Sequence, residues 1–465
     1  MNRVFLRLNI ITLLVALLRG AAVAQVPAAL AGDWNGELAV PGAPLGVVVR
    51  INAAAGQPPA ATLDVPAQRL SGLAFSKVEM QADSLVLTSD FLGARYAAKP
   101  APDGQQLVGW WKQNGARWPL TLQRGQPERK RPQDPVPPLP YREQEVRFLN
   151  PVSKLNLAGT LTVPPGKGPF PAVVLVTGSG AQDRDESILG HRPFRVLADY
   201  LTRRGVAVLR YDDRGTGKSQ GDYAAATTDD LLTDAQAALA FLRAQSGVRA
   251  KRVGMVGHSE GGTIALLAGA QAQPPAFIVT LAGMGVRGAE LLVRQQADVL
   301  RAAGLTDTAR LGQMRRTQQA VLATVQTTPD NPPAIARVVA LLKPVSPGIS
   351  ESALTAMAAQ MTGPWYRYFL SLDPRPALAR VRAPVLALNG TKDVQVAADL
   401  NLPAIEQGLK AGGNRDVTVL ALDGLNHLFQ TAKTGLPAEY GQLEETFSPS
   451  ALQLIGNWLA ARTTK

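Results

Sequence analysis

The hydrophobic pattern divides the chain into two parts that differ in period. Between residues 32 and 124, short apolar runs alternate with polar positions and are separated by turn residues. These runs include LGVVVRI, DSLVLTS, LVGWWKQ and RWPLTLQ. Alternation with a period of two predicts strands with one buried face, and no helical period interrupts it. We therefore expect residues 25–125 to form a small antiparallel all-β domain, either a barrel or a sandwich.

From residue 145 to the C-terminus, wholly apolar strands alternate with amphipathic helices. The expected strands are AVVLVTG, VAVLRYD, RVGMVGH, AFIVTLAG, PVLALNG and DVTVLALDG. Between them, stretches such as RPFRVLADYLTRRG and TDDLLTDAQAALAFLRAQ have helical spacing. Strands that are apolar on both sides belong to parallel sheets covered by helices on both faces. The pattern predicts a doubly wound, mostly parallel α/β sheet over residues 145–465.

A long stretch without a convincing core strand, about residues 286–370, interrupts this alternation. AELLVRQQADVL and RLGQMRRTQQAVLATV have the pattern of amphipathic helices. Because the stretch follows the carboxyl end of a strand, where such sheets bind ligands, we expect a helical lid over the site. The alternative is a purely structural subdomain.

Residues 1–24 have the pattern of an export signal. Positive charges precede a short apolar core at 10–18, and small residues at 22–24 offer a cleavage site. The core is shorter than the roughly 20 residues that a membrane-spanning helix needs. We expect a periplasmic or secreted protein with no stable membrane insertion after cleavage. Arg19 leaves an uncleaved anchor as the alternative.

A proline-rich segment, residues 126–144, separates the two patterns. Its six prolines favour extended backbone, so we expect a semi-rigid linker. The only dense basic run of a chain with a formal charge of +12 lies here, at 129–131. Nucleic-acid-binding proteins concentrate such charge on one face, whereas the other arginines here are scattered. We therefore expect no nucleic-acid partner.

Two residue types narrow the possible sites further. The chain has no cysteine, which excludes disulfides, thiolate metal ligands and a cysteine nucleophile. Four of the six tryptophans, Trp34, Trp110, Trp111 and Trp118, fall in the expected β-domain. We expect them in its core, and a sugar or lipid site is the alternative.

A serine between glycines follows one of the apolar strands. In Gly257-His258-Ser259-Glu260-Gly261, small residues allow the sharp strand-to-helix turn that exposes a nucleophilic hydroxyl. A free serine hydroxyl is a weak nucleophile and requires a base. Without one, the stretch would be a glycine-rich turn with an incidental serine.

The chain offers three histidines for the role of base. His258 adjoins the serine, and a tight turn would direct its side chain elsewhere. His191 precedes an expected helix, where a packing role is expected. His427, in LDGLNHLFQ, follows the last strand, where a loop can reach over the sheet. Position alone favours His427.

The acid is expected after another strand and before the histidine in the chain. Asp393 follows PVLALNG directly and meets both conditions. Asp423 is nearer to His427 in sequence, but we expect it to serve its own turn. The order Ser259, Asp393, His427 is that of a serine hydrolase built on an α/β sheet.

An oxyanion hole requires two N–H donors near the serine. The residue after the nucleophile, Glu260, supplies one, and a loop after an early strand supplies the other. VTGSGAQDRDE is that loop, and we expect the donor to be Ser179. The charged part of the loop, residues 182–186, is expected to support it, with recognition of a polar substrate group as the alternative.

Five stretches resemble those of the α/β-hydrolase superfamily, and within it exported bacterial carboxylesterases of the EstD type with a serine aminopeptidase-like domain. They are TGSGAQDRDE, RPFRVLADYLTRRGVAVLRYDDRGTGKS, VGHSEGG, PVLALNGTKD and GLNHLFQTA. The resemblance implies Ser259 as nucleophile, Asp393 as acid, His427 as base, and action on short-chain esters without a cofactor. Thr177 stands where many such hydrolases have histidine, which leaves the backbone donors unaffected.

No cofactor or metal is expected. YDDRGTGKS ends like a phosphate-binding loop, but Asp212 stands where that motif requires glycine. We expect a structural loop in which Asp213 and Arg214 pair. No histidine pattern has metal-ligand spacing.

The sequence therefore predicts an exported serine carboxylesterase that acts on a small-molecule ester through an acyl-enzyme. One alternative is a peptidase using the same triad, and another is a non-catalytic ligand-binding protein.

Overall fold

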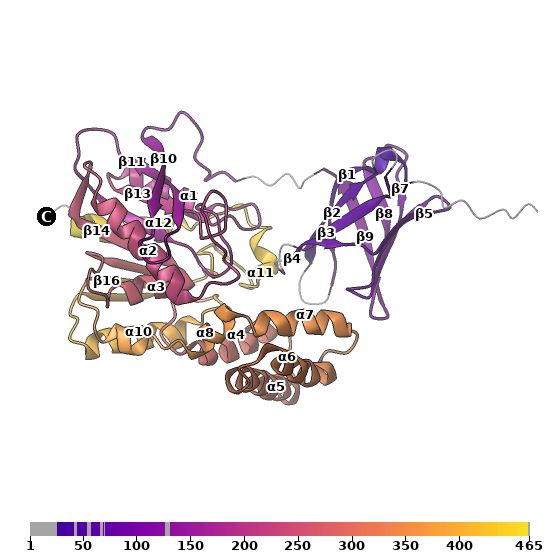
Figure 1. Ribbon diagram of the computed structural model, residues 1–465. Helices are drawn as coiled ribbons and strands as arrows, with labels where there is room; N and C mark the ends of the chain where they lie inside the picture. Colours follow the sequence, from indigo (N-terminus) through magenta and orange to yellow (C-terminus); the bar gives the residue numbers. More distant parts are fainter. Residues whose placement is uncertain are drawn as a thin grey trace, which may run out of the picture.

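The fold contains two separate sheets, one within residues 32–124 and the other within residues 142–422 (Figure 1). The computed structural model describes residues 26–40, 44–53, 57–65, 68, 70–125 and 131–463. The expected export signal, residues 1–24, lies outside these ranges. Within the described residues, no helix combines the length and apolar character needed to cross a bilayer.

The N-terminal sheet has nine strands in the order β4-β3-β2-β1-β9-β8-β7-β6-β5. Its hydrogen-bonded neighbours run antiparallel, as the alternating pattern predicts. The strands are β1 (Gly32–Leu38), β2 (Leu45–Asn52), β3 (Ala60–Val65), β4 (Leu70–Ala74), β5 (Lys77–Gln81), β6 (Ser84–Ser89), β7 (Ala94–Pro100), β8 (Gln106–Gln113) and β9 (Ala116–Arg124). A short 3₁₀ helix, Ala28–Leu30, precedes them.

The tryptophans of this sheet do not all lie in its core. Trp34 and Trp111 are buried, and Trp118 is partly buried against the same cluster. Trp110 is 42% exposed, and the guanidinium carbon of Arg117 lies 3.9 Å from its ring centroid. The core prediction is wrong for Trp110, because its position on β8 faces outward and β9 supplies a cation instead of an apolar cover.

The second sheet has eight strands in the order β10-β11-β13-β12-β14-β15-β16-β17. At one edge, β10 pairs antiparallel with β11, and β11 pairs antiparallel with β13. The strands from β13 to β17 in this order run parallel to one another. The strands are β10 (Arg142–Leu149), β11 (Asn156–Val163), β12 (Phe170–Val176), β13 (Ala207–Tyr211), β14 (Val248–His258), β15 (Ile278–Leu281), β16 (Val385–Gly390) and β17 (Val417–Leu422).

Helices pack against both faces of this mixed sheet. On β12, Val174 joins one hydrophobic cluster, whereas Val173 and Leu175 join another, because successive strand residues point to opposite faces. The helices outside the long insertion are α1 (Pro193–Arg203), α2 (Thr228–Arg243), α3 (Glu260–Ala268), α9 (Arg375–Leu378), α10 (Ala398–Ala411), α11 (Pro437–Tyr440) and α12 (Pro449–Thr463). α2, α3 and α10 contribute to the first cluster, and α1 and α12 to the second.

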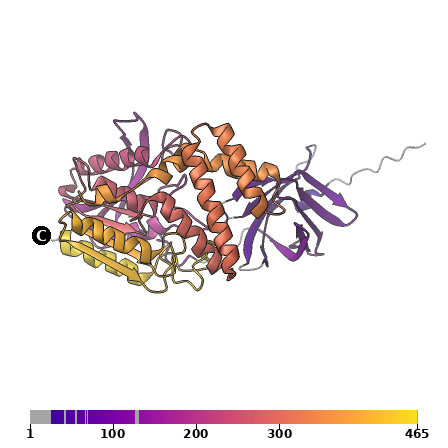
Figure 2. The same cartoon turned by 90° about the horizontal axis from the view of Figure 1, so that it is seen from below.

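Between β15 and β16 the chain forms an insertion of helices with a small core of its own. The helices are α4 (Gly288–Ala302), α5 (Thr308–Thr327), α6 (Asn331–Leu342), η3 (Lys343–Val345), α7 (Glu351–Met361) and α8 (Pro364–Ser371). Val321, Leu322 and Val325 of α5 are buried there, in agreement with the amphipathic pattern of this stretch. Figure 2 shows these helices in orange beside the N-terminal strands, and Ser350 Oγ donates to the Phe91 carbonyl.

The proline-rich segment is not a free spacer in its described part. Arg131 donates to the Leu443 carbonyl, and Gln133 bonds the backbone of residues 446 and 447. The Tyr141 hydroxyl donates to Asp199 of α1 at 2.8 Å. β10 begins at Arg142, three residues before the expected boundary. Polar side chains that bond the backbone of the α/β part fix this segment, a feature that proline content does not reveal.

Candidate active site

Ser259 lies at a sharp turn between β14 and α3. Its backbone has φ 54° and ψ −119°, a region that costs a non-glycine residue free energy and that marks functional turns. A Cβ on Gly257 would lie 2.0 Å from the Gly261 carbonyl oxygen, and one on Gly261 would lie 2.1 Å from the Val176 oxygen. Only glycines therefore permit this turn, which presents the serine hydroxyl at the carboxyl end of the sheet.

Asp393 and His427 meet beside this turn. Nδ1 of His427 lies 2.7 Å from Oδ2 of Asp393, and the carboxylate side chain is fully buried. The other oxygen, Oδ1, accepts hydrogen bonds from the backbone N–H groups of Gln395 and Val396 at 2.8 Å each. Asp423 is exposed and accepts from the Thr391 hydroxyl instead. The carboxylate on the His427 ring is thus Asp393.

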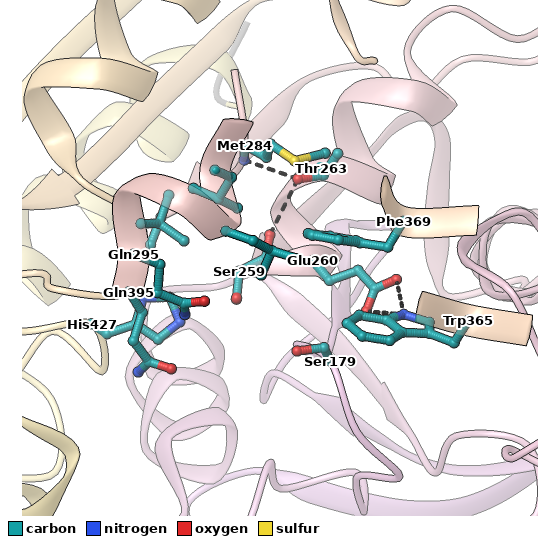
Figure 3. A pocket seen from close by; sticks show the side chains of 14 residues that line it. Ser179, Ser259, Glu260, Thr263, Met284, Gln295, Trp365, Phe369, Gln395 and His427 are labelled. Carbon is teal, nitrogen blue, oxygen red and sulfur yellow. Dashed lines mark hydrogen bonds between the residues drawn. The ribbon is translucent and has the colours of Figure 1, made fainter. Parts of the chain in front are cut away.

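A cavity of about 200 Å³ brings the predicted residues together. Ser259, His427, Ser179 and Glu260 all line it. In Figure 3 the Ser259 side chain lies between His427 on one side and the pair of Glu260 and Trp365 on the other. Side chains from α4 and α8 of the insertion complete the wall, namely Leu291, Leu292, Gln295, Trp365 and Phe369.

The loop after β12 presents one free N–H to this cavity. The N–H of Gly178 donates to Glu186 Oε1 at 2.8 Å, and that of Gly180 donates to the Tyr223 hydroxyl at 2.8 Å. For Ser179, between them, the described residues provide no acceptor. Glu260 is the first residue of α3, where the N–H lacks an acceptor within the helix. Both expected oxyanion donors are therefore available at the cavity wall.

The side chain of Glu260 connects the serine turn to the helical insertion. Its carboxyl group is buried and accepts hydrogen bonds from the Thr228 hydroxyl at 2.6 Å and from Trp365 Nε1 at 2.8 Å. Burial raises the pKa of this carboxyl, and the two hydrogen bonds oppose that shift. Among the described residues, no lysine or arginine forms an ion pair with it.

The comparisons with known proteins place this site in a family. The model of the family described as X-Pro dipeptidyl-peptidase (S15 family) matches residues 155–403, more than half of the chain. The chain belongs to this family. The matched range includes Ser259 and Asp393 and ends before His427.

This S15-family chain is also similar to individual esterases. It is 28% identical over 290 residues to esterase EstD of Thermotoga maritima, in an alignment that spans 61% of each protein. An esterase of Pyrococcus furiosus is 14% identical with a TM-score of 0.45, over 73% of this chain and all of the other. An α/β hydrolase of a Penicillium species is 18% identical with a TM-score of 0.42, over 70% of this chain and all of the other.

The remaining histidines lie outside the Asp393–His427 pair. His191 is fully buried and bonds the Thr446 hydroxyl and the Tyr440 carbonyl, which agrees with the expected packing role. His258 lies closer to the site than expected. Its Nε2 lies 2.8 Å from the carbonyl oxygen of His427, so its ring is directed toward the base loop.

Two features of this S15-family site were not predicted from the sequence. The contact between Trp365 and Glu260 joins residues 105 positions apart, and no motif marks Trp365 as its partner. The second feature is the pair of hydrogen bonds that Glu186 forms with the Gly178 N–H and the His258 ring. The sequence predicted only that residues 182–186 support the oxyanion loop. No group of three or more histidine or carboxylate side chains in the described part of the chain could hold a metal ion.

Asp213 and Arg214 do not pair with each other. Arg214 bonds Asp234 at 2.7 Å through Nε, whereas Asp213 accepts from the Thr177 hydroxyl and the Gln182 N–H. Neighbours in a turn point in different directions, so adjacency in sequence was a poor guide. Burial, aided by nearby carboxylates, raises the pKa of Asp213 to about 8, although its two hydrogen bonds lower it.

This raised pKa predicts a pH dependence of stability. The folded state holds the Asp213 proton more tightly than the unfolded state, so stability decreases as the pH rises from about 4 to 8. Asp213→Asn should therefore melt a few degrees above wild type at pH 9 and close to it at pH 5, since each kcal/mol shifts Tm by about 2–4 °C in domains of roughly 150–250 residues and by less in larger ones. Melting curves of both proteins across this pH range provide the measurement.

Asp222→Asn is the matched control, because it removes the same charge from an exposed position nearby. Equal gains from both substitutions at pH 9 would assign the effect to net charge and not to the buried carboxyl.

Proposed function

We propose that the protein is an exported serine carboxylesterase that hydrolyses short-chain carboxylic esters through Ser259, His427 and Asp393. The proposal rests on the 2.7 Å contact between His427 and Asp393 at a cavity that Ser259 also lines. The similarity to esterase EstD over 61% of that protein supports an ester as the substrate. The apolar and small-residue pattern of residues 1–24 supports export to the periplasm or the medium.

The proposed reaction proceeds through an acyl-enzyme. His427 takes the proton of the Ser259 hydroxyl, which attacks the ester carbonyl. The N–H groups of Ser179 and Glu260 donate to the oxyanion, where stabilisation of developing charge lowers the barrier most. Asp393 holds the ring of His427 and stabilises its charged form. His427 then activates the water that releases the acid, so the scheme uses neither a metal nor an organic cofactor.

The size of the cavity supports short acyl groups. Its volume of about 200 Å³ is below the roughly 300–1,000 Å³ of pockets for drug-sized ligands. Because α4 and α8 supply part of its wall, we assign the insertion as a lid over a doubly wound α/β-hydrolase sheet. The lid would then set the acyl length that the enzyme accepts.

A panel of chromogenic substrates tests the proposal. We expect the wild-type protein to hydrolyse p-nitrophenyl acetate and butyrate faster than the decanoate, and to leave amino-acid p-nitroanilides intact. A fluorophosphonate should inactivate it with one mass adduct, located on the peptide that contains Ser259. Inert esters together with no adduct would contradict the proposal.

A peptidase is the second candidate, and Glu260 favours it. A buried carboxyl that lines the cavity without a basic partner could bind the free amine of a peptide substrate. The family name describes peptidases that act on X-Pro peptides. Faster hydrolysis of alanyl-proline p-nitroanilide than of any ester in the panel would select this candidate.

Trp365 is expected to limit acyl length. The cavity with Ser259 and a second, more open one of about 690 Å³ share Trp365 and Ser179 in their walls. Trp365→Ala should connect them and raise the ratio of kcat/KM for octanoate to acetate by about tenfold, the lower range for one misfitting methylene. Trp365→Phe retains an aromatic wall but removes the N–H bonded to Glu260, so its ratio should match wild type. An unchanged ratio in Trp365→Ala would place the limiting wall elsewhere.

A further inference from the structure

A second pair of carboxylate and imidazole lies beside Asp393 and His427. Nδ1 of His258 is 2.8 Å from Oε1 of Glu186, and both side chains are buried. The rings of His258 and His427 have centroids 4.7 Å apart. The proposed reaction assigns no step to this pair.

A doubly protonated ring would satisfy both hydrogen-bond partners of His258. Nε2 faces the carbonyl oxygen of His427, which only accepts, and Nδ1 faces the Glu186 carboxylate, which also accepts from the N–H of Gly178. A neutral imidazole has one N–H and satisfies one of these acceptors. Burial alone would lower the pKa of His258, but the charge and hydrogen bond of Glu186, together with the His427 carbonyl and the Asp393 charge, raise it.

The pair connects three segments that carry the proposed catalytic groups. Glu186 holds Gly178, which precedes the oxyanion donor Ser179. His258 precedes Ser259, and its ring holds the backbone of the base His427 itself. Each end of this connection is therefore no more than one residue from a reacting group.

The packing around Gly178 leaves these segments little freedom. A Cβ at Gly178 would lie 3.2 Å from both Glu186 Oε1 and the Ser259 Cβ, and 3.5 Å from His258 Nδ1. Glu186 itself adopts a positive φ of 53° to reach this position. A residue held in a strained backbone conformation beside a reaction centre points to a function for it.

We propose that Glu186 and His258 are positioning residues, which together hold the oxyanion loop and the loop of His427 at the spacing that the transition state requires. This inference rests on the proposed function, because it assigns Ser179, Ser259 and His427 the roles given above. It predicts an effect on turnover that exceeds any effect on substrate binding, since the groups displaced act mainly in the transition state.

Glu186→Gln tests the proposal. The amide has no charge to hold the second proton on His258, so either the Gly178 bond or the His427 carbonyl bond is lost. We expect kcat for p-nitrophenyl butyrate to fall roughly 100-fold, the cost of a misplacement of about 1 Å, with KM within about twofold. The inhibition constant of an alkyl boronic acid, which mimics the tetrahedral intermediate, should rise by a similar factor.

A second substitution and a double-mutant cycle distinguish a positioning role of this pair from a role in stability alone. His258→Asn retains a donor near Glu186 and has no atom at the place of Nε2, so it should lower kcat to a similar extent. Because both side chains act through one connection, the double variant should be no less active than the less active of the two single variants. Glu444→Gln is the matched control, since it makes the same chemical change at an exposed position. Fluorophosphonate titration corrects each kcat for the active fraction.

The outcomes distinguish this proposal from the function on which it rests. If wild type does not hydrolyse esters, the proposed function fails. If wild type is active and Glu186→Gln retains the wild-type kcat, the positioning role is wrong. It is also wrong if the double variant loses activity by the product of the two single losses, because the two side chains would then act independently. If Glu186→Gln and His258→Asn both fail to fold, the pair serves stability and the proposal is overturned.

Discussion

Replacing Ser259 by alanine is expected to reduce ester hydrolysis to the background rate. Alanine has no hydroxyl and cannot form an acyl-enzyme. Water would have to attack the ester carbonyl directly, without a nucleophile held in place at the cavity wall. Removing the serine of other serine hydrolases costs on the order of a million-fold in kcat, so no signal above buffer should remain in a p-nitrophenyl butyrate assay. The fluorophosphonate adduct should disappear at the same time.

Ser187→Ala provides the control for this loss. Ser187 is exposed on the loop that follows the oxyanion donor, and its hydroxyl is outside the cavity wall. The control should retain wild-type kcat and the adduct. Full turnover in Ser259→Ala would remove the nucleophile from the mechanism, whatever the rest of the site does.

The arrangement of Ser259, Asp393 and His427 could be expected from the sequence for a simple reason. Each follows an apolar strand directly or within one short loop, and the carboxyl ends of parallel strands meet at one edge of a sheet. The chain has three histidines, so the position of His427 after the last strand was enough to select it as the candidate base. The sequence could also distinguish Asp393 from Asp423 as the acid. Asp393 follows a different strand from the one that precedes His427, whereas Asp423 lies on the same loop as His427 and is expected to serve its own turn.

Contacts between side chains distant in sequence could not be predicted in this way. Trp365 reaches Glu260 from a helix of the insertion, and its place depends on how α8 packs against α2 and the other helices of the insertion. His258 was expected to point away from the site, yet the turn at Ser259 directs its ring toward the His427 carbonyl. Hydrophobic period identifies elements, whereas such contacts depend on the angles between them.

Charged neighbours were a misleading guide for the same physical reason. Asp213 and Arg214 are adjacent and opposite in charge, but the chain turns there, and each finds its partner on another element. In the proline-rich segment, Arg131 and Tyr141 bond groups more than 50 residues away. Proline content predicts a backbone tendency for that segment and gives no information about what the segment packs against.

Asp393→Asn is expected to reduce kcat by about 10,000-fold while leaving the fold intact. Two backbone N–H groups, of Gln395 and Val396, donate to Oδ1, so the asparagine must place its carbonyl oxygen there. Its NH₂ group then faces His427, whose Nδ1 must become an acceptor. The proton moves to Nε2, the nitrogen that has to take the proton of Ser259, and the base is lost. In another serine hydrolase the equivalent change has this magnitude.

Asp423→Asn is the decisive control, because it makes the same chemical change on the loop that precedes His427. Asp423 is exposed and bonds Thr391, so its loss should change kcat less than twofold. The comparison requires kcat on p-nitrophenyl butyrate, the rate of fluorophosphonate inactivation and the melting temperature of both variants. A large loss in Asp423→Asn with activity retained in Asp393→Asn would exchange the roles of the two carboxylates. Equal and modest losses in both would mean that His427 does not depend on a carboxylate for its tautomer.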